Sequence, residues 1–258
     1  MNKNYIYIPE LNQLPSRVYF RYDEYGADTH GAAHRHQWGQ LNYTARGVMQ
    51  LQIDGRPYMS PPNYAVWIPP HQLHSCYNRE SVLYRSVYIA LSECCLLPEH
   101  PCAVAMSPIL KAILNDFADR DVTTPISQPD LNLAQVLLDQ LQLAPIEADY
   151  LPYGQSDMVN FVLNKLSSDP GDSTVLCDWA KQVFVSERTL ARYFIQELGM
   201  SFGEWRQRLR FLTAIDALEQ GRAIKEIALD MGYSNSSAFI TMFIRHAGCT
   251  PEQYRRLV

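Results

Sequence analysis

The sequence lacks any run of about 18 apolar residues, the length that a membrane-spanning helix requires. Its first residues, Met1 to Tyr5, also lack the hydrophobic core of a secretory signal peptide. We therefore expect no membrane partner and predict a cytoplasmic protein.

Cysteine pairs with the spacing of a zinc site are absent as well. The six cysteines lie at positions 76, 94, 95, 102, 177 and 249, and no two of them are separated by two residues. We interpret them as reduced, partly buried thiols.

Neither half of the chain has an excess of positive charge. From residue 157 onward there are 12 Lys and Arg against 12 Asp and Glu, which leaves 10 basic and 15 acidic residues in positions 1–156. Basic side chains usually supply much of the affinity for nucleic acid by neutralising phosphates. Any DNA binding by the second half must therefore concentrate positive charge on one face.

The last hundred residues contain two helix–turn–helix patterns. The first occupies 173–199, where Ser173 and Thr174 are candidate N-caps of its first helix. Ser186 is the expected cap of the second helix, and Gly199 is suited to end it. A helix pair of this kind presents one helix to the major groove of DNA.

The exposed face of the second helix is predicted to carry Arg188, Thr189 and Arg192 near its N-terminal end. Recognition helices contact base edges from these positions. An arginine fork can bond guanine or grip a phosphate. The alternative is an ordinary solvated face, but the surrounding pattern favours DNA contact.

The second pattern occupies 223–248 and repeats this design. Gly232 is suited to the positive φ of its turn, and Ser234 or Asn235 caps the following helix. The positions expected to face inward are Ala238, Phe239, Met242 and Phe243.

Short hydroxyl side chains are expected on the outer face of this helix, at Ser236, Ser237 and Thr241. They discriminate bases weakly. Arg245, further along, is a better candidate for a phosphate contact. We therefore expect the first motif to specify sequence and the second mainly to anchor.

One amphipathic helix, over about 202–220, is predicted to connect the motifs. Ser201 and Glu204 form a capping box at its start. Such a helix fixes the distance between the two recognition helices, which must match about one DNA turn, ~34 Å. Its arginines at 206, 208 and 210 have two open interpretations, phosphate contacts or plain surface. The apolar seam comprises Trp205, Leu209, Leu212, Ile215 and Leu218.

Residues 157–256 resemble the DNA-binding domain of the AraC/XylS family of bacterial transcription regulators. The resemblance implies two subdomains that insert helices into successive major-groove segments. Phe184 departs from it, because the family usually has a turn glycine there, and so does Thr241, where some members have arginine. The matching motifs are Leu190…Phe194…Gly199, Arg210…Ala214, Ile227-Ala228…Met231-Gly232-Tyr233, Phe239…Phe243 and Gly248-Cys249-Thr250-Pro251…Tyr254-Arg255.

The first half alternates apolar and polar residues over 40–89, and Asp54-Gly55 is a hairpin signal. Short strands broken by Gly, Pro and Asn predict a small β-barrel or jelly roll. Helices are predicted over 109–118 and over 131–143, and the latter either forms a dimer interface or packs on the barrel.

The predicted fold class is therefore α+β with two domains. Residues 1–145 form a cupin-like β-barrel with following helices, 146–156 a proline-bearing linker, and 157–258 the helical domain. The length of 258 residues suits two domains of ordinary size.

A histidine pattern lies within the barrel. His34, His36 and Gln40 resemble the first cupin motif, with glutamine in place of its acid, and His71 and His74 resemble the second, with His71 in place of its glycine. His34 and His36 can share one strand face. Together with His74 they could hold Zn²⁺, Ni²⁺ or Fe²⁺.

Three roles remain open for these histidines: metal binding, contact with a small molecule, or packing. Trp38, Tyr43 and Trp67 either line the same effector cavity or belong to the core.

The leading functional hypothesis is a transcription regulator, not an enzyme, that binds double-stranded promoter DNA and responds to a small molecule or metal ion in its barrel. A homodimer is a possible state, and RNA polymerase is a further partner if the protein activates. The alternative is a metal-dependent cupin enzyme, a dioxygenase or isomerase, with an accessory helical domain.

Overall fold

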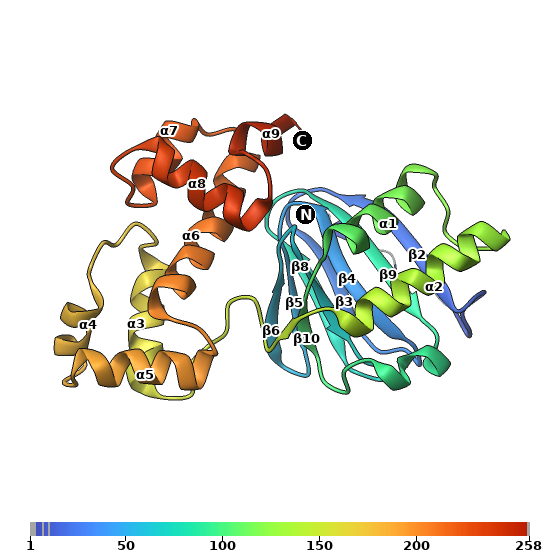
Figure 1. Cartoon of the computed structure of the whole chain (residues 1–258), viewed down its shortest axis with the longest axis horizontal. Helices are drawn as coiled ribbons and strands as arrows, with labels where there is room; N and C mark the ends of the chain where they lie inside the picture. Colours follow the sequence, from blue (N-terminus) through green and yellow to red (C-terminus); the bar gives the residue numbers. More distant parts are fainter. Residues whose placement is uncertain (1–3, 7, 10, 257–258) are drawn as a thin grey trace. The chain divides into compact units, whose positions relative to one another are not determined.

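The computed structural model describes residues 4–6, 8–9 and 11–256. The chain divides into two compact units, residues 1–150 (unit 1) and 151–258 (unit 2) (Figure 1). In the described part of the chain, no helix has both the length and the apolar character needed to cross a bilayer.

Unit 1 contains two β-sheets that together form a jelly-roll-like sandwich and not a closed barrel. The five-stranded sheet runs β1 (Asn4–Tyr5), β3 (Thr29–His34), β8 (His74–Asn78), β5 (Met49–Ile53), β6 (Arg56–Ser60). The six-stranded sheet runs β11 (Ile146–Glu147), β10 (Cys102–Ala105), β7 (Tyr64–Ile68), β4 (Gly39–Arg46), β9 (Val82–Ile89), β2 (Val18–Tyr25).

The hairpin predicted at Asp54-Gly55 is confirmed. β5 pairs antiparallel with β6, and Ile53 lies opposite Arg56. The two turn residues have φ of 47° and 78°, as a two-residue hairpin turn with positive φ at both positions requires.

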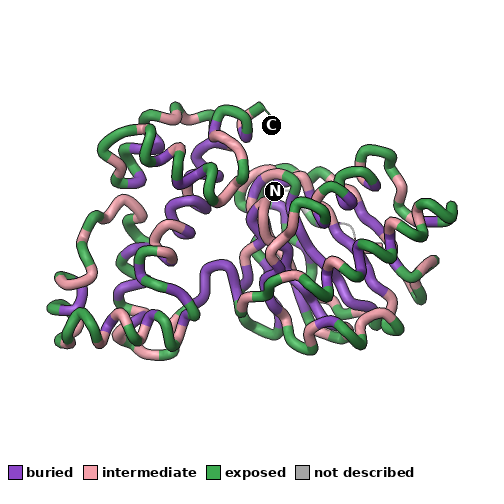
Figure 2. The backbone as a smooth tube through the Cα atoms, viewed as in Figure 1, coloured by how far each residue is buried: buried purple, intermediate pink, exposed green. Residues whose placement is uncertain are grey.

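Successive side chains along β4 point to opposite faces of the sheet, and both faces are buried over most of the strand. Leu41 and Tyr43 point toward helices α1 (Pro108–Asp119) and α2 (Gln128–Leu143), which pack on the six-stranded sheet (Figures 1 and 2). Gln40, Asn42 and Thr44 point the other way, between the two sheets, and are also buried. The interior between the sheets is therefore partly polar.

Both predicted helices of unit 1 are confirmed, with a shift at the second. Ser107 caps α1 by accepting from the Leu110 amide. α2 begins at Gln128, before the predicted start at 131, because Ser127 accepts from the Asp130 amide and acts as the cap.

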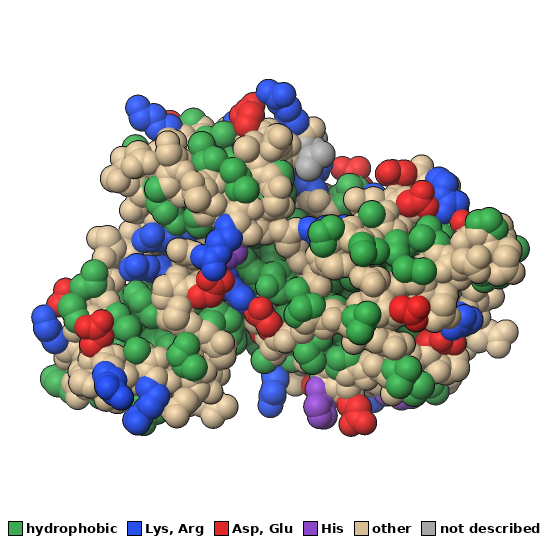
Figure 3. Space-filling view, in the orientation of Figure 1, with side chains coloured by type: hydrophobic (Ala, Val, Ile, Leu, Met, Phe, Trp, Pro, Cys, Tyr) green, Lys and Arg blue, Asp and Glu red, His purple; other side chains and the backbone are tan. Residues whose placement is uncertain are grey.

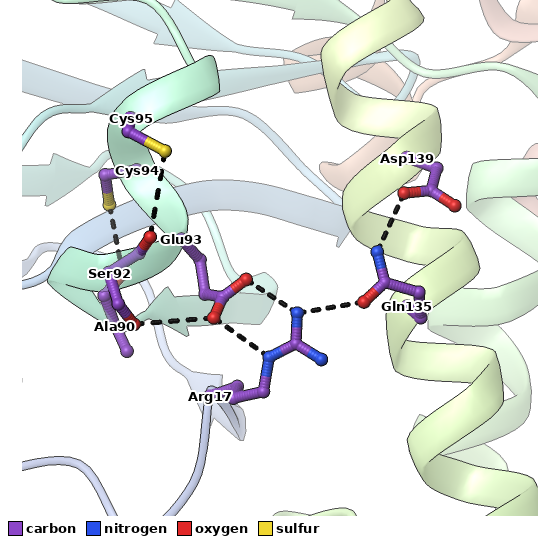
Figure 4. A network of polar contacts seen from close by, with 8 residues as sticks. All are labelled: Arg17, Ala90, Ser92, Glu93, Cys94, Cys95, Gln135 and Asp139. Atoms are coloured by element: carbon purple, nitrogen blue, oxygen red, sulfur yellow. Dashed lines mark hydrogen bonds and ion pairs between the residues drawn. The ribbon is translucent and has the colours of Figure 1, made fainter.

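A polar network ties α2 to the sheet (Figure 4). Arg17, just before β2, makes two hydrogen bonds to Glu93, at 2.9 and 2.7 Å, and a third to Gln135 at 2.8 Å. Glu93 belongs to the 3-10 helix η1 (Leu91–Leu96), and Gln135 in turn donates to Asp139 on α2. Sheet, short helix and long helix are thereby held together at one end of unit 1.

The segment predicted as a linker, 146–156, is divided between the two units and packs within each of them. Ile146 and Glu147 pair with β10 in the six-stranded sheet, so they are not a linker. On the other side of the boundary, the carbonyl of Pro152 accepts from Trp205 Nε1 at 2.9 Å. The Glu197 carboxylate accepts from the amides of residues 155 and 156, at 2.7 and 2.9 Å.

Unit 2 is helical, and its two helix–turn–helix motifs are α4–α5 and α7–α8. α6 connects them, and its predicted apolar seam is buried. The helices are α3 (Asp157–Ser168), α4 (Leu176–Gln182), α5 (Glu187–Leu198), α6 (Phe202–Glu219), α7 (Ile224–Asp230), α8 (Ser236–Ala247) and α9 (Pro251–Arg256).

Most of the predicted helix ends are confirmed. Ser186 accepts from the Thr189 amide, Asn235 accepts from the Ala238 amide, and Gly199 and Gly248 end their helices with φ of 71° and 76°.

The cap predicted for α4 at Ser173 or Thr174 is wrong. The capping position is Val175, whose side chain makes no capping bond, because the Asp172 side chain binds the Thr174 amide and holds this loop.

Candidate functional sites

The outer face of α5 places arginines where a recognition helix needs them. Arg188 and Arg192 are exposed, and within the described residues neither pairs with a carboxylate. Thr189 is half-buried, and its hydroxyl lies 2.8 Å from that of Ser186. In the space-filling view, basic side chains (blue) project over α4 and α5 (Figure 3). The same two helices also carry Asp178, Glu187 and Glu197, so their net charge is zero.

The outer face of α8 carries short hydroxyl side chains, whereas the outer face of α5 carries arginines. Ser237 and Thr241 are exposed, Ser236 is half-buried, and the Thr241 hydroxyl donates to the carbonyl of Ser237 at 3.0 Å. Ala238 is exposed, so the prediction that it faces inward is wrong. It lies one position before the buried Phe239, at the edge of the apolar stripe.

Arg245 on α8 has partners within the protein. Its guanidinium lies 3.2 Å from the Glu204 carboxylate and 3.4 Å from the Gln207 amide oxygen, both on α6. It remains 64% exposed, so a phosphate could still reach it.

The arginines at the start of α6 contact the protein, and neither of their predicted roles is correct. Arg208 and Arg210 are buried. Arg208 pairs with Glu204 at 3.1 Å, and Arg210 donates to backbone carbonyls of the loop before α4. Arg206 is half-buried and donates to the carbonyl of Thr174 at 3.0 Å.

In unit 1, His34, His36 and His74 converge as predicted. His34 and His74 lie opposite each other on β3 and β8, with ring centroids 4.2 Å apart. His36, in the loop after β3, lies 4.9 Å from His74 between ring centroids. One ring nitrogen from each histidine lies within 4.8 Å of the others. We call this group the histidine cluster.

Hydrogen bonds identify the nitrogens that are available in this cluster. The Nδ1 atoms of His34, His36 and His74 lie 2.9, 2.8 and 2.9 Å from the carbonyls of residues 32, 38 and 72. A carbonyl only accepts, so Nδ1 of His34 and of His74 carries the proton and, in the neutral ring, their Nε2 keeps its lone pair, whereas His36 Nε2 faces the Gln40 side chain. Nε2 of His74 is buried and finds no hydrogen-bond partner in the described part of the chain.

Burial lowers the pKa of all three histidines. The effect is largest at His74, where burial, assisted by repulsion from His34, lowers the pKa to about 3. Repulsion from Arg21 adds to the lowering at His34. The cluster is therefore neutral at physiological pH, which is the form that can bind a metal or accept hydrogen bonds.

Gln40 interacts with the cluster in place of the acid of the cupin motif. Its side-chain amide lies 3.0 Å from His36 Nε2 and 3.3 Å from the Tyr84 hydroxyl. The amide oxygen faces His36 Nε2, and the amide NH₂ donates to the Tyr84 hydroxyl. Gln40 thus fixes the orientation of His36.

A buried arginine beside this cluster was missed in the sequence. Arg21 on β2 donates to the Tyr88 hydroxyl at 3.0 Å and pairs with Asp23 at 2.8 Å, and the Tyr88 ring lies 5.4 Å from that of His36. Arginine in a strand normally faces solvent. Val18 and Phe20 are buried under the helices, and alternation along β2 places Arg21 on the opposite face of the sheet. Only this alternation could have indicated its inward position.

The aromatic residues expected to line the effector cavity divide between two places. Trp38 stacks on His36 at 4.8 Å and lines a pocket of about 330 Å³ together with His34, His36 and Tyr88. For Tyr43 and Trp67 the prediction is wrong. Both lie on the opposite face of the six-stranded sheet, in the core beneath α1 and α2.

The second cupin-like motif keeps a left-handed backbone at its glycine position. His71 stands where that motif has glycine, and its φ is 68°, in the left-handed region that glycine favours. Its amide donates to the carbonyl of His36 at 2.8 Å, which links the two motifs.

Known proteins match both units. Residues 179–257 match the family model of a helix-turn-helix domain, and residues 17–99 match that of an AraC-like ligand binding domain. The HTH-type transcriptional regulator NimR of Escherichia coli (strain K12) is 31% identical over 222 residues, which cover 86% of this chain and 81% of NimR. The regulator RipA of Corynebacterium diphtheriae is 37% identical over 93 residues, 36% of this chain and 28% of RipA.

In a structural comparison, ToxT from Vibrio cholerae with bound unsaturated fatty acid aligns with a TM-score of 0.38 at 15% identity, over 95% of this chain and 96% of ToxT.

A tandem helix–turn–helix unit joined to a ligand-binding jelly roll defines the class of DNA-binding transcription regulators that respond to a ligand. Within that class, the chain belongs to the AraC/XylS family.

Proposed function

We propose that α5 reads DNA bases through Arg188, Thr189 and Arg192, and that α8 mainly anchors the protein through Ser236, Ser237 and Thr241, with Arg245 on a phosphate. The observation that supports this is the pair of exposed arginines on α5, which have no carboxylate partner in the part of the chain that the structure describes. An arginine that bonds two acceptors of guanine contributes ~1–3 kcal/mol of discrimination.

The DNA-binding test uses a duplex that the wild-type protein selects from a random pool. We expect Arg188→Ala and Arg192→Ala each to weaken binding to this duplex by ~1–3 kcal/mol. Lys225→Ala on α7, an exposed basic residue outside both reading helices, is the matched control. Equal losses in all three variants would contradict base reading by α5.

For unit 1 we propose that the effector binds at the histidine cluster and in the adjoining pocket. The observation that carries this proposal is the buried Nε2 of His74, which has no hydrogen-bond partner among the described residues and lies among neutral imidazoles. A buried polar atom without a partner costs about 1–3 kcal/mol, and a bound ligand would recover this. Trp38, whose Nε1 likewise has no partner within the described ranges, and Gln40 complete the proposed site.

A divalent metal of the Zn²⁺, Ni²⁺ or Fe²⁺ type fits this donor set. Each Nδ1–H is bound to a backbone carbonyl, an arrangement that orients histidines which bind metal through Nε2. His34, His36 and His74 would hold the ion, and exogenous groups would complete its coordination. A small molecule that donates hydrogen bonds to the same nitrogens is the second effector chemistry, supported by the pocket lined with Trp38 and Tyr88.

Titration calorimetry with Zn²⁺, Ni²⁺ and anaerobic Fe²⁺, followed by metal analysis after dialysis, separates the two chemistries. One ion per chain in the wild type and none in His74→Gln supports the metal. No binding of any ion by the wild type excludes these metals and leaves the organic effector. Tightly held iron with no affinity for DNA would favour the alternative, a cupin enzyme.

We further infer that the chain does not catalyse a reaction, because its relatives are transcription regulators and Gln40 occupies the position of the acidic cupin ligand. Its partner is promoter DNA, which places its action in the bacterial cytoplasm. RNA polymerase is a further partner if it activates. The exposed Val136 and Leu143 on α2 mark the face where we expect a second copy to pack, and light scattering tests this.

A further inference from the structure

Arg210, in the middle of α6, contacts the loop before the first helix–turn–helix motif and the turn of the second. Its guanidinium donates to the carbonyls of Pro170 and Asp172, each at 2.9 Å, and lies 3.4 Å from that of Gly171. These residues form the loop that leads into α4. The same guanidinium lies 5.3 Å from the ring centroid of Tyr233, which follows the turn between α7 and α8.

The two segments that Arg210 connects also touch each other through glycines. A Cβ added at Gly171 would collide with the carbonyl oxygen of Asp230. One added at Gly232 would collide with the carbonyl oxygen of Gly171 and crowd the Arg210 guanidinium. Backbones approach this closely only where side chains are absent. We call residues 170–172, 230–233 and Arg210 the Arg210 joint.

Arginine is suited to this position because its planar fork can hold several carbonyls at once while its face lies on an aromatic ring. The side chain is 7% exposed, so it is withdrawn from any phosphate. Arg206, one turn earlier, binds the same loop only through Thr174, and its guanidinium lies over Phe202 of its own helix, 4.8 Å from the ring centroid.

We propose that the Arg210 joint fixes the separation and orientation of α5 and α8, and so sets the spacing between the two DNA segments that the protein reads. This inference rests on the proposed reading roles of α5 and α8. Two linked binding modules gain most affinity when their fixed separation matches that of their sites. With a rigid link, affinity falls steeply when the spacing of the sites changes. With a loose link, affinity at the matched spacing is lower, but it falls less at other spacings.

The test compares the wild type with Arg210→Gln on a series of duplexes. The parent duplex is selected by the wild type from a random pool, and footprinting locates its two protected segments. Derivatives carry one or two base pairs inserted or deleted between these segments, and a further duplex keeps only the segment contacted by α5.

We expect the wild type to lose about tenfold or more in affinity when the spacing changes by one base pair. Arg210→Gln should bind the parent duplex about tenfold more weakly and vary less than about threefold over the series. Its affinity for the single-segment duplex should stay within about twofold of the wild type, because α5 itself is unchanged.

Three further variants make the result specific. Arg206→Gln is the matched control and should keep the steep dependence on spacing. Arg210→Lys should restore part of it, because an ammonium can bind one carbonyl but lacks the fork. Gly171→Ala should make affinity depend less on spacing without any change of charge. If a thermal melt shows that Arg210→Gln does not fold, Gly171→Ala and Arg210→Lys replace it in the test.

A steep dependence on spacing in Arg210→Gln and Gly171→Ala would overturn the proposal. So would an equal loss on the single-segment duplex, which would mean that Arg210 serves only the first motif. Failure of the underlying reading roles has a different signature, since Arg188→Ala and Arg192→Ala would then leave every affinity unchanged.

Discussion

Phe184, in the turn of the first helix–turn–helix motif, combines backbone strain with exposure. Its φ is 59°, and it is 94% exposed, so contacts of its ring do not offset the strain. The sequence indicated this residue as a departure from a turn glycine, and the structure shows that the turn keeps the left-handed geometry.

We expect Phe184→Gly to raise the free energy of unfolding of unit 2 by about 0.5–1 kcal/mol, because glycine adopts positive φ without steric cost. Urea unfolding followed by circular dichroism measures the change. Phe184→Leu is the control, since it keeps a Cβ in the same conformation. A glycine variant that unfolds at lower urea than the wild type would show that the ring contributes more than the strain costs.

His74 gives unit 1 a defined response to pH. Its pKa is about 3 in the folded protein, below the ordinary value of 6.5, so the unfolded chain takes up the proton more readily. The stability contributed by the neutral ring is complete above pH ~6.5 and falls as the pH drops toward 3. At pH 5 the loss from this one group is about 2 kcal/mol.

Denaturant titrations of the wild type between pH 7.5 and pH 5 measure this loss. His74→Gln, which does not titrate, should lose less stability over the same range, although His34 and His36 still contribute in the same direction. Identical slopes in both proteins would assign the pH dependence to other groups.

At the scale of the element, an ion pair connects α6 and α8. Glu204 on α6 accepts from Arg245 on α8 and from Arg208 on its own helix. Glu204→Gln keeps an acceptor for the buried Arg208 but removes the charge that holds Arg245.

We expect Glu204→Gln to bind non-specific duplex a few-fold more tightly than the wild type, with the slope of log K against log salt steeper by about one, because Arg245 becomes free to neutralise a phosphate. Stability should change by less than ~1 kcal/mol. Fluorescence anisotropy at several salt concentrations measures both quantities. Glu252→Gln on α9 makes the same change of charge away from α8, and an equal effect there would mean that only net charge matters.

Elements were predictable from the sequence where local chemistry determines them. Ser186 and Gly199 mark the ends of α5 because caps act on the adjacent backbone, and Asp54-Gly55 marks a hairpin for the same reason. Tyr43 and Trp67 were misplaced because alternation separates the two faces of a strand but does not say which layer each face meets.

The arginines of α6 show the same limit at longer range. Arg206 and Arg210 share one side of α6 and Arg208 lies on the other, and their partners are a carboxylate on α6 itself and carbonyls far away in the sequence. Arg208 pairs with Glu204 at the local i,i+4 spacing, whereas the carbonyl contacts of Arg206 and Arg210 depend on tertiary structure, and no local pattern in one sequence encodes them. The histidine cluster was predictable because His34 and His36 are close in the sequence and His74 lies in a recognisable motif.

For the whole molecule, the boundary between the units decides which fragment can stand alone. A fragment that begins at 155, two residues before the predicted helical domain, would lack Pro152, whose carbonyl accepts from the buried Trp205. A fragment of residues 151–258 keeps this acceptor, and we expect it to fold and to bind the selected duplex without an effector. A fragment of residues 155–258 should be less stable by about 1–2 kcal/mol, because a buried indole N–H loses its partner.

Thermal melts of both fragments and gel-shift titrations of the longer one test this boundary. Trp205→Phe in residues 151–258 is the control, since it removes the donor together with the need for an acceptor. Shortening the fragment to residue 155 should therefore cost the Trp205→Phe variant less than it costs the wild-type sequence, by the difference that belongs to this hydrogen bond. If the longer fragment is insoluble, or if shortening costs both sequences equally, the folding unit does not begin at the Pro152–Trp205 contact.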